Sequence, residues 1–244
     1  MDFCGVTDKG IVRKQNQDVF LAEEISLINA VLLTVCDGMG GAKAGNVASR
    51  MALDLFREKM IERLDPFMTA KSAAKTMRKA VTEVNTALFE KNVKDPACRG
   101  MGTTLVAALV TESWTLVLNV GDSRAYKVTS DGITQITKDH SVVEDLIDRG
   151  DISRYEALHH PNRHLITRAL GTARGIEPDV FQPELKEGDS ILLCSDGLTN
   201  LVGDQELLYE VLKTQDVKES CEQLIKLALI RGAPDNVTAV LLRR

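Results

Sequence analysis

The chain has 244 residues, of which 44% are hydrophobic and 27% charged, and its formal net charge is -5. This length and composition fit a globular protein with a substantial core, in one large domain or two small ones. No cluster of Lys and Arg stands out, and no apolar run approaches the roughly 18 residues of a membrane span. Neither nucleic acid nor a membrane is therefore an expected partner.

The pattern of cysteines and the first residues of the chain favour a cytoplasmic location. Five cysteines are scattered along the chain without a C-x-x-C pair, which is typical of reduced thiols. The opening segment Met1–Gly5 lacks the basic and apolar regions of a signal peptide. We expect a cytoplasmic monomer.

The first half of the chain predicts three strands and a helix pair. The strands are expected at residues 2–7, 19–23 and 28–36. Apolar residues at helical spacing predict helices over about 46–64 and 70–88. Asp65-Pro66 separates the two helices, so they are expected to lie antiparallel.

Short strands dominate the middle of the chain. They are predicted at residues 103–110, 114–120, 124–129 and 133–136. Because the connections between them are short, the strands must form antiparallel hairpins. Ser141-x-x-Glu144 resembles a capping box for a helix over 142–149, and residues 150–165 look polar and irregular.

The last part of the chain predicts strands and a second helix pair. The strands are expected at residues 176–181, 190–195 and 237–242, and Asp204 and Asp216 are expected to cap two helices between them. Helices therefore come in pairs instead of alternating with single strands. This layout favours an α+β fold, with antiparallel sheets covered by helix pairs, in one domain over 1–244.

Five aspartates lie at the predicted strand ends. Asp37 and Asp196 each follow an apolar run and precede a glycine. The other three are Asp18, Asp122 and Asp235. Any one of them also fits an ordinary turn. If strand 237–242 pairs antiparallel with 190–195, however, Asp196 and Asp235 share one sheet edge.

Carboxylates gathered at one edge repel one another unless a cation lies among them. No His or Cys accompanies these aspartates, and oxygen-only ligands suit Mg²⁺ or Mn²⁺ rather than zinc. Gly38 allows a backbone carbonyl to join the ligands. Two such cations activate a shared water for attack on a phosphoryl group, and a guanidinium then binds the phosphate oxygens. Arg13 is the candidate, since it shares a loop with Asp18; an ordinary surface role is the alternative.

Seven short motifs occur along the chain in a fixed order: Arg13-x-x-Asn16-Gln17-Asp18, Asp37-Gly38-Met39-Gly40-Gly41, Met101-Gly102-Thr103-Thr104, Gly121-Asp122-Ser123-Arg124, Thr167-Arg168-Ala169-Leu170-Gly171, Ser195-Asp196-Gly197 and Asp235-Asn236-Val237-Thr238. Together and in this order they resemble the metal-dependent serine/threonine protein phosphatases (type 2C, PPM), in a compact bacterial form. The resemblance spans about residues 3–242.

The resemblance implies a four-layer αββα sandwich and the hydrolysis of phosphoserine and phosphothreonine by a metal-bridging water. It implies two Mn²⁺ or Mg²⁺ ions, with a third in bacterial members. The implied substrates are phosphorylated proteins, among them a serine/threonine kinase. Residues 141–165 match a flap beside the site.

The same resemblance assigns the site residues. Asp37 bridges the two ions, Gly38 offers its carbonyl, and Asp18 acts through water. Asp196 and Asp235 complete the coordination of the second ion, and Asp122 and Asp196 coordinate the third. Arg13 binds the phosphate group of the substrate.

The sequence departs from the family at the position of the general acid, and Gln17 also replaces a glutamate that some members have. Where many members carry a histidine proposed as general acid, this chain has Met39 and Ala42. Its four histidines, all in or near the flap, are His140, His159, His160 and His164. His140 or His160 is a candidate to reach the site, and a zinc site in the flap stays open.

Two other functions remain as alternatives. One is a non-catalytic module that binds phosphoproteins on the same scaffold, although a binder has no need of a full set of carboxylates. The other is a metal-dependent phosphodiesterase or nuclease, which the acidic balance disfavours.

Overall fold

A computed structural model describes residues 1–244, except for the side chains of Ala42 and Lys43. The first sheet has the strand order β1-β11-β10-β7-β8, and all its pairs are antiparallel. Its strands are β1 (Asp2–Asp8), β7 (Arg124–Thr129), β8 (Gly132–Gln135), β10 (Ser190–Cys194) and β11 (Val237–Arg243).

The second sheet has the order β2-β3-β5-β6-β9, again antiparallel, and the short strand β4 pairs with the end of β3. Its strands are β2 (Asp18–Ile25), β3 (Ala30–Met39), β4 (Gly102–Thr103), β5 (Leu105–Thr111), β6 (Thr115–Val120) and β9 (Asp179–Phe181).

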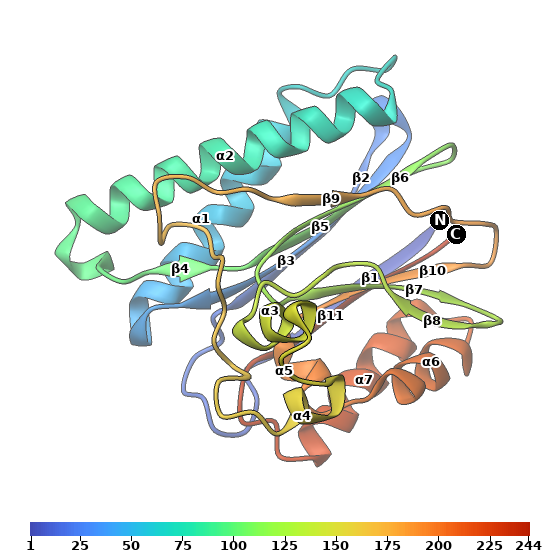
Figure 1. The fold of residues 1–244 in the computed structure, drawn as a ribbon. Helices are drawn as coiled ribbons and strands as arrows, with labels where there is room; N and C mark the ends of the chain where they lie inside the picture. Colours follow the sequence, from blue (N-terminus) through green and yellow to red (C-terminus); the bar gives the residue numbers. More distant parts are fainter.

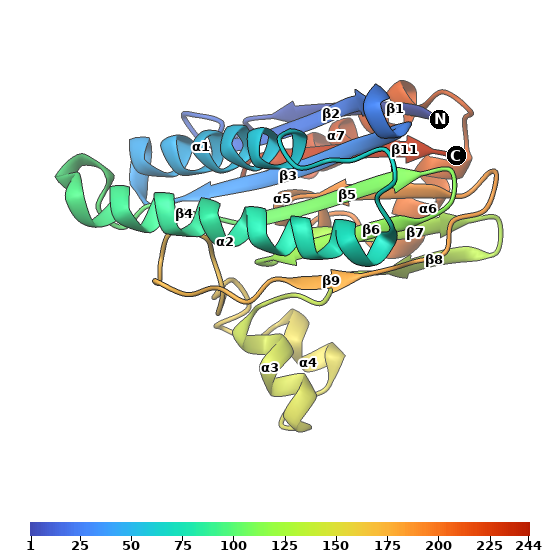
Figure 2. The ribbon, with the colours of Figure 1, turned by 90° about the horizontal axis from the view of Figure 1, so that it is seen from above.

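Helix pairs cover the outer faces of the two sheets (Figure 1). The long helices α1 (Gly41–Ile61) and α2 (Ala70–Lys94) lie over the second sheet, and α6 (Asp204–Leu212) and α7 (Val217–Ile230) cover the first, beside the short α5 (Asp196–Thr199). Two further helices, α3 (Val142–Arg149) and α4 (Arg154–Leu158), project from the side of the sandwich (Figure 2). Single 3-10 turns occupy Ser26–Ile28 and Pro96–Cys98.

Three hydrophobic layers lie between the four layers of helices and sheets. Strand β3 shows how one strand contributes side chains to two of them. Leu32 packs with the residues of α1 and α2, whereas Val31 and Leu33 pack with the residues of the other sheet. Successive strand side chains point to opposite faces, so a strand between two packed layers must be apolar on both. A third layer lies between the first sheet and α7. The predicted αββα sandwich is confirmed.

Several element bounds differ from the predictions. Helix α1 begins at Gly41 rather than near residue 46, because Gly40 and Gly41 have φ values of 119° and 80° and turn the chain straight from β3 into the helix. Helix α2 continues beyond residue 88 to Lys94, and the strand expected at 176–181 is reduced to β9. Residues 150–165, expected to be irregular, contain α4 with its own Ser153–Glu156 capping box.

The predicted caps are confirmed in part. Asp216 caps α7 and accepts the backbone N–H groups of Lys218 and Glu219. Asp204 is the first residue of α6 rather than its cap, which is Gly203. Ser141 caps α3, but the Glu144 carboxylate of the expected box accepts a hydrogen bond from Arg154 instead. Among the described residues, no helix is both long and apolar enough to cross a bilayer.

Candidate active site

Strand pairing brings the predicted aspartates together at one end of the sandwich. Asp18 and Asp37 are direct partners in the β2–β3 register. Strands β10 and β11 pair antiparallel, and the Ser195 N–H donates to the Thr238 carbonyl just beyond the ladder. Asp196 and Asp235 therefore flank the same sheet edge, as the sequence predicted.

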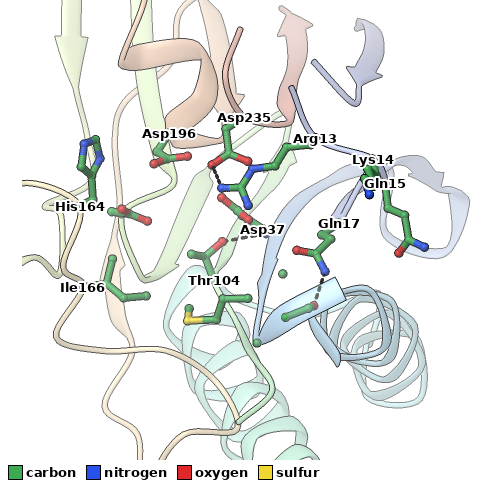
Figure 3. Close-up of a pocket in the computed structure, with 15 residues that line it drawn as sticks. Arg13, Lys14, Gln15, Gln17, Asp37, Thr104, His164, Ile166, Asp196 and Asp235 are labelled. Carbon is green, nitrogen blue, oxygen red and sulfur yellow. Dashed lines mark hydrogen bonds and ion pairs between the residues drawn. The ribbon is translucent and has the colours of Figure 1, made fainter. Parts of the chain in front are cut away.

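A cavity of about 540 Å³ opens at this end of the molecule. Its wall includes Asp37, Asp122, Asp196 and Asp235, with Arg13 beside them (Figure 3). Four of the five predicted aspartates thus line one space. Asp18 lies beneath it, with only 3% of its surface exposed.

Asp18 is held by two hydroxyl groups from the other sheet. Its Oδ2 accepts hydrogen bonds of 2.7 Å from Ser195 Oγ and from Thr238 Oγ1, while its Oδ1 is buried with no hydrogen-bond partner among the described residues. Burial raises the pKa of Asp18 to about 6, against the lowering effect of the two hydroxyls. This oxygen is therefore a buried acceptor without a donor in the described part of the chain.

Asp37 is fixed through its backbone. Its N–H donates to Thr104 Oγ1 at 2.9 Å, and its carbonyl accepts from the Thr104 N–H at 2.9 Å and from Thr103 Oγ1 at 2.8 Å. Burial, followed by repulsion from Asp18 and Asp196, raises the pKa of Asp37 well above its usual value. Strand β3 and the segment after β4 therefore hold this carboxyl rigidly at the strand end.

Asp196 and Asp122 complete the acidic wall. One Asp196 oxygen, Oδ2, accepts from Asn200 at 3.0 Å, and the other is buried without a hydrogen-bond partner in the described part of the chain. Burial and then the charge of Asp235 raise the pKa of Asp196. Burial, followed by repulsion from Asp196 and Asp139, raises the pKa of Asp122 to about 7. The negative charges of these carboxylates therefore destabilise one another.

Arg13 lies against the acidic cluster. Its Nη2 donates to Asp235 Oδ2 at 2.6 Å, with both side chains partly exposed (Figure 3). Asn236 anchors the loop that carries Arg13, since its Oδ1 accepts the Gln17 N–H and its Nδ2 donates to the Lys9 and Gln15 carbonyls. The loop thus holds the guanidinium at the cavity wall.

Two glycines allow the backbone to approach closely around the site. A Cβ on Gly38 would lie 2.2 Å from the Gly45 carbonyl oxygen, so β3 and α1 cross here with no room for a side chain. A Cβ on Gly197 would lie 1.9 Å from the carbonyl oxygen of Asn236. These contacts explain why glycine follows both Asp37 and Asp196.

The histidines are placed differently from the sequence-based expectation. His164, rather than His140 or His160, lines the cavity, together with Met39 (Figure 3). His140 is buried, with 5% of its surface exposed. Among the described residues no group of His, Cys, Asp or Glu is arranged to hold zinc in the flap. Ala42 is the other position at which many family members carry the histidine, and its side chain lies outside the described residues.

Several supporting residues were not singled out from the sequence. Thr104 positions Asp37 and also hydrogen-bonds Ser123 at 2.8 Å, and Ser195 and Thr238 position Asp18. Thr104, Ser123, Ser195 and Thr238 all lie inside the seven motifs, and this was the one sequence feature that could have identified them. Their contacts span 19 to 220 residues of sequence, so spacing alone gives no pairing.

A comparison with protein families decides the identity of this site. The family model described as Protein phosphatase 2C matches residues 11–227. The chain belongs to the protein phosphatase 2C family. The match includes the Arg13 loop and the aspartates from Asp18 to Asp196; Asp235 follows it.

Known serine/threonine phosphatases resemble this chain over nearly its full length. The serine/threonine phosphatase stp of Listeria monocytogenes is 38% identical over 242 residues, 98% of this chain and 94% of that protein. The crystal structure of serine/threonine phosphatase Stp1 from Staphylococcus aureus has a TM-score of 0.93 at 38% identity, covering 100% of this chain and 94% of the other.

One similar structure contains metal ions. It is the catalytic domain of the serine/threonine protein phosphatase PstP in complex with two manganese ions. It is 37% identical to this chain, with a TM-score of 0.83, and the match covers 98% of this chain and 96% of that one.

Proposed function

We propose that this chain is a protein phosphatase that hydrolyses phosphoserine and phosphothreonine with the help of Mn²⁺ or Mg²⁺. The observation that carries the proposal is the convergence of four aspartates on one cavity, with a loop arginine at its wall. Membership in the phosphatase 2C family and the names of the similar proteins support the same reaction.

The donor set fits hard divalent cations. It consists of carboxylate oxygens, and the buried Oδ1 atoms of Asp18 and Asp196 have no hydrogen-bond partner among the described residues. Burial and mutual repulsion raise the pKa values of these aspartates, and a bound cation offsets both costs.

We assign the ligands as follows. One ion would be held by Asp37 and the Gly38 carbonyl, with Asp18 acting through water. A second ion would be held by Asp37, Asp196 and Asp235, and a third by Asp122 and Asp196. The register that places Asp18 beside Asp37, and Asp196 beside Asp235, supports this division.

Ion binding requires a local rearrangement. In the described residues, no group of three or more His, Cys, Asp or Glu side chains is arranged to hold an ion as it stands. Arg13 currently neutralises Asp235. An ion that bound through Asp235 Oδ2 would compete with the guanidinium for that oxygen, and a displaced guanidinium would be free to bind two phosphate oxygens of the substrate.

The bound ions supply an activated water and positive charge near the phosphoryl oxygens. The chain's own residues do the rest of the work. Arg13 orients the phosphate, and Thr104 and the β2–β3 register position Asp37 and Asp18. Residues 141–165 form a flap beside the cavity within a single catalytic domain. Phosphorylated proteins, a serine/threonine kinase among them, are the proposed substrates.

Assays on purified protein test this function. We expect phosphate release from phosphoserine and phosphothreonine peptides with Mn²⁺ or Mg²⁺, and its loss when EDTA is added. Binding of phosphopeptides without phosphate release at any ion concentration would instead favour the non-catalytic binding module. Hydrolysis of nucleic acid but not of phosphopeptides would favour a phosphodiesterase.

A further inference from the structure

His140 forms two hydrogen bonds with Gly121, the residue directly before Asp122. The His140 N–H donates to the Gly121 carbonyl at 2.9 Å, and the Gly121 N–H donates to His140 Nδ1 at 3.1 Å. Both residues are buried. A buried N–H without an acceptor is costly, so the imidazole nitrogen fixes the backbone directly before Asp122.

The same histidine closes the root of the flap. Its carbonyl accepts the Thr167 N–H at 2.7 Å. Next to it, Ser141 forms a bridge with Ile166, and the Val142 N–H donates to the Leu165 carbonyl at 2.8 Å. The flap helices α3 and α4 therefore leave and rejoin the sandwich at His140. Figure 2 shows these helices standing away from the sheets beyond that root.

The far side of the ring is also fixed. His140 Nε2 lies 3.2 Å from Asp179 Oδ2 on β9. Since Nδ1 accepts from Gly121, Nε2 carries the proton and donates it to this carboxylate. Arg168 Nη1 is near the same nitrogen and lies 3.4 Å from the other oxygen of Asp179. Strand β9 thus holds one tautomer of the ring.

The Asp122 turn has little freedom on its other side. Gly121 has a φ of +111°, and a Cβ there would lie 2.6 Å from the Thr104 side chain. Thr104 in turn holds Asp37 and Ser123. His140 is therefore one of several supports of this turn, beside Thr104 and Asn119, whose Nδ2 donates to the Gly121 carbonyl at 3.1 Å. Among these supports, His140 is the one whose own carbonyl also accepts the Thr167 N–H at the far end of the flap.

We propose that His140 is a positioning residue that sets Asp122 for the third ion and couples occupancy of that ion site to the flap. The proposal rests on the proposed function for its ion assignment. The hydrogen bond from the Gly121 N–H to His140 Nδ1 is the coupling contact. It joins the turn before Asp122 to His140, which directly precedes the flap and hydrogen-bonds Thr167 just after it.

Two substitutions of similar size separate this contact from simple loss of the ring. His140→Asn keeps an oxygen near the position of Nδ1, whereas His140→Gln places its polar group near Nε2 and leaves the Gly121 N–H unpaired. His160→Asn and His160→Gln are the matched controls, because His160 Nδ1 accepts the Asn162 N–H at 3.1 Å in an exposed part of the flap.

The primary readout is Mn²⁺ binding by calorimetry. We expect His140→Gln to weaken the weakest Mn²⁺ site about 10- to 100-fold, as loss of ligand-orienting contacts does, with the tighter sites unchanged. His140→Asn and both His160 variants should stay close to wild type. Equal Mn²⁺ binding by His140→Gln and wild type overturns the positioning role, as does equal weakening by His140→Asn.

Hydrogen exchange provides a second measurement that needs no substitution at His140. In wild-type protein, Mn²⁺ should slow amide exchange at Gly121 and Thr167 together, and Asp122→Asn should remove that slowing. Unchanged slowing in Asp122→Asn overturns the coupling. Phosphopeptide hydrolysis by wild type tests the proposed function separately, so the two failures are distinguishable.

Discussion

Removing the charge of Asp122 should stabilise the protein when divalent ions are absent. The pKa of this carboxyl rises from 3.8 to about 7, chiefly because burial disfavours its charged form and secondly because Asp196 and Asp139 repel it. At neutral pH the folded protein therefore holds a carboxylate in a place that favours the neutral acid. Asp122→Asn keeps the shape of the side chain and removes that charge.

The size of the effect follows from the shift. At about 1.4 kcal/mol for each factor of ten in the ionisation constant, a rise from 3.8 to about 7 corresponds to about 4 kcal/mol. Asp122 borders the cavity and reaches solvent in part, so we expect about half of this, about 2 kcal/mol, in the free energy of unfolding. For a chain of this length that is a rise in Tm of about 4–8 °C.

The pH dependence has a definite sign. Between the unfolded pKa and the folded pKa, the folded state binds more protons than the unfolded state at Asp122, so wild-type stability falls as the pH rises. The loss begins near pH 4 and is complete above about pH 7. The advantage of Asp122→Asn should therefore be small at pH 4 and largest at pH 7.5.

Thermal and urea unfolding in EDTA at several pH values measure this difference. Asp131→Asn, in the exposed turn between β7 and β8, is the matched control and should be neutral throughout. A variant no more stable than wild type at pH 7.5, or one with the same advantage at pH 4 and pH 7.5, would refute the electrostatic reasoning. Saturating Mn²⁺ should reverse the order, because wild type gains more from ion binding.

Two other substitutions test separate parts of the site. Arg13→Ala should raise KM for a phosphopeptide about tenfold and lower kcat less, because its proposed contact is with the phosphate of bound substrate; steady-state kinetics with saturating Mn²⁺ measure this, and an unchanged KM would refute the phosphate role. Gly38→Ala should lower the free energy of unfolding by about 2–4 kcal/mol, because the new Cβ would lie 2.2 Å from the Gly45 carbonyl oxygen. Its control is Gly175→Ala, where a Cβ meets nothing within 4 Å, and equal stability of the two variants would contradict the close crossing of β3 and α1.

The strand-end aspartates were accessible from the sequence because they depend on local rules. If residues 190–195 and 237–242 pair antiparallel, Asp196 and Asp235 must share one sheet edge, and the structure shows that pairing although three helices separate the two strands in the sequence. The paired helices predicted antiparallel sheets covered by helix pairs, and the four-layer αββα arrangement was implied by the family resemblance; the structure shows both.

Other features depend on contacts that no local pattern carries. The start of α1 was misplaced because Gly40 and Gly41 suppress the apolar periodicity just where the helix begins. His164 was not expected at the cavity, since the path of the flap depends on hydrogen bonds that join its two ends, from Val142 to Leu165 and from Thr167 to His140, and its polar sequence carries no sign of them. The pairing of Ser195 and Thr238 with Asp18 joins the two sheets across the sandwich.

Asp37→Asn tests the central claim most directly. Burial, and then the charges of Asp18, Asp196, Asp122 and Asp235, raise the pKa of Asp37, so it interacts with every other member of the acidic cluster. Phosphate release from a phosphothreonine peptide should require Mn²⁺ or Mg²⁺ in wild type and should fall by about 10³-fold or more in the variant, with weaker Mn²⁺ binding by calorimetry. A folded Asp37→Asn protein with full activity and unchanged Mn²⁺ binding would contradict the assignment of this cavity as a metal-dependent phosphatase site.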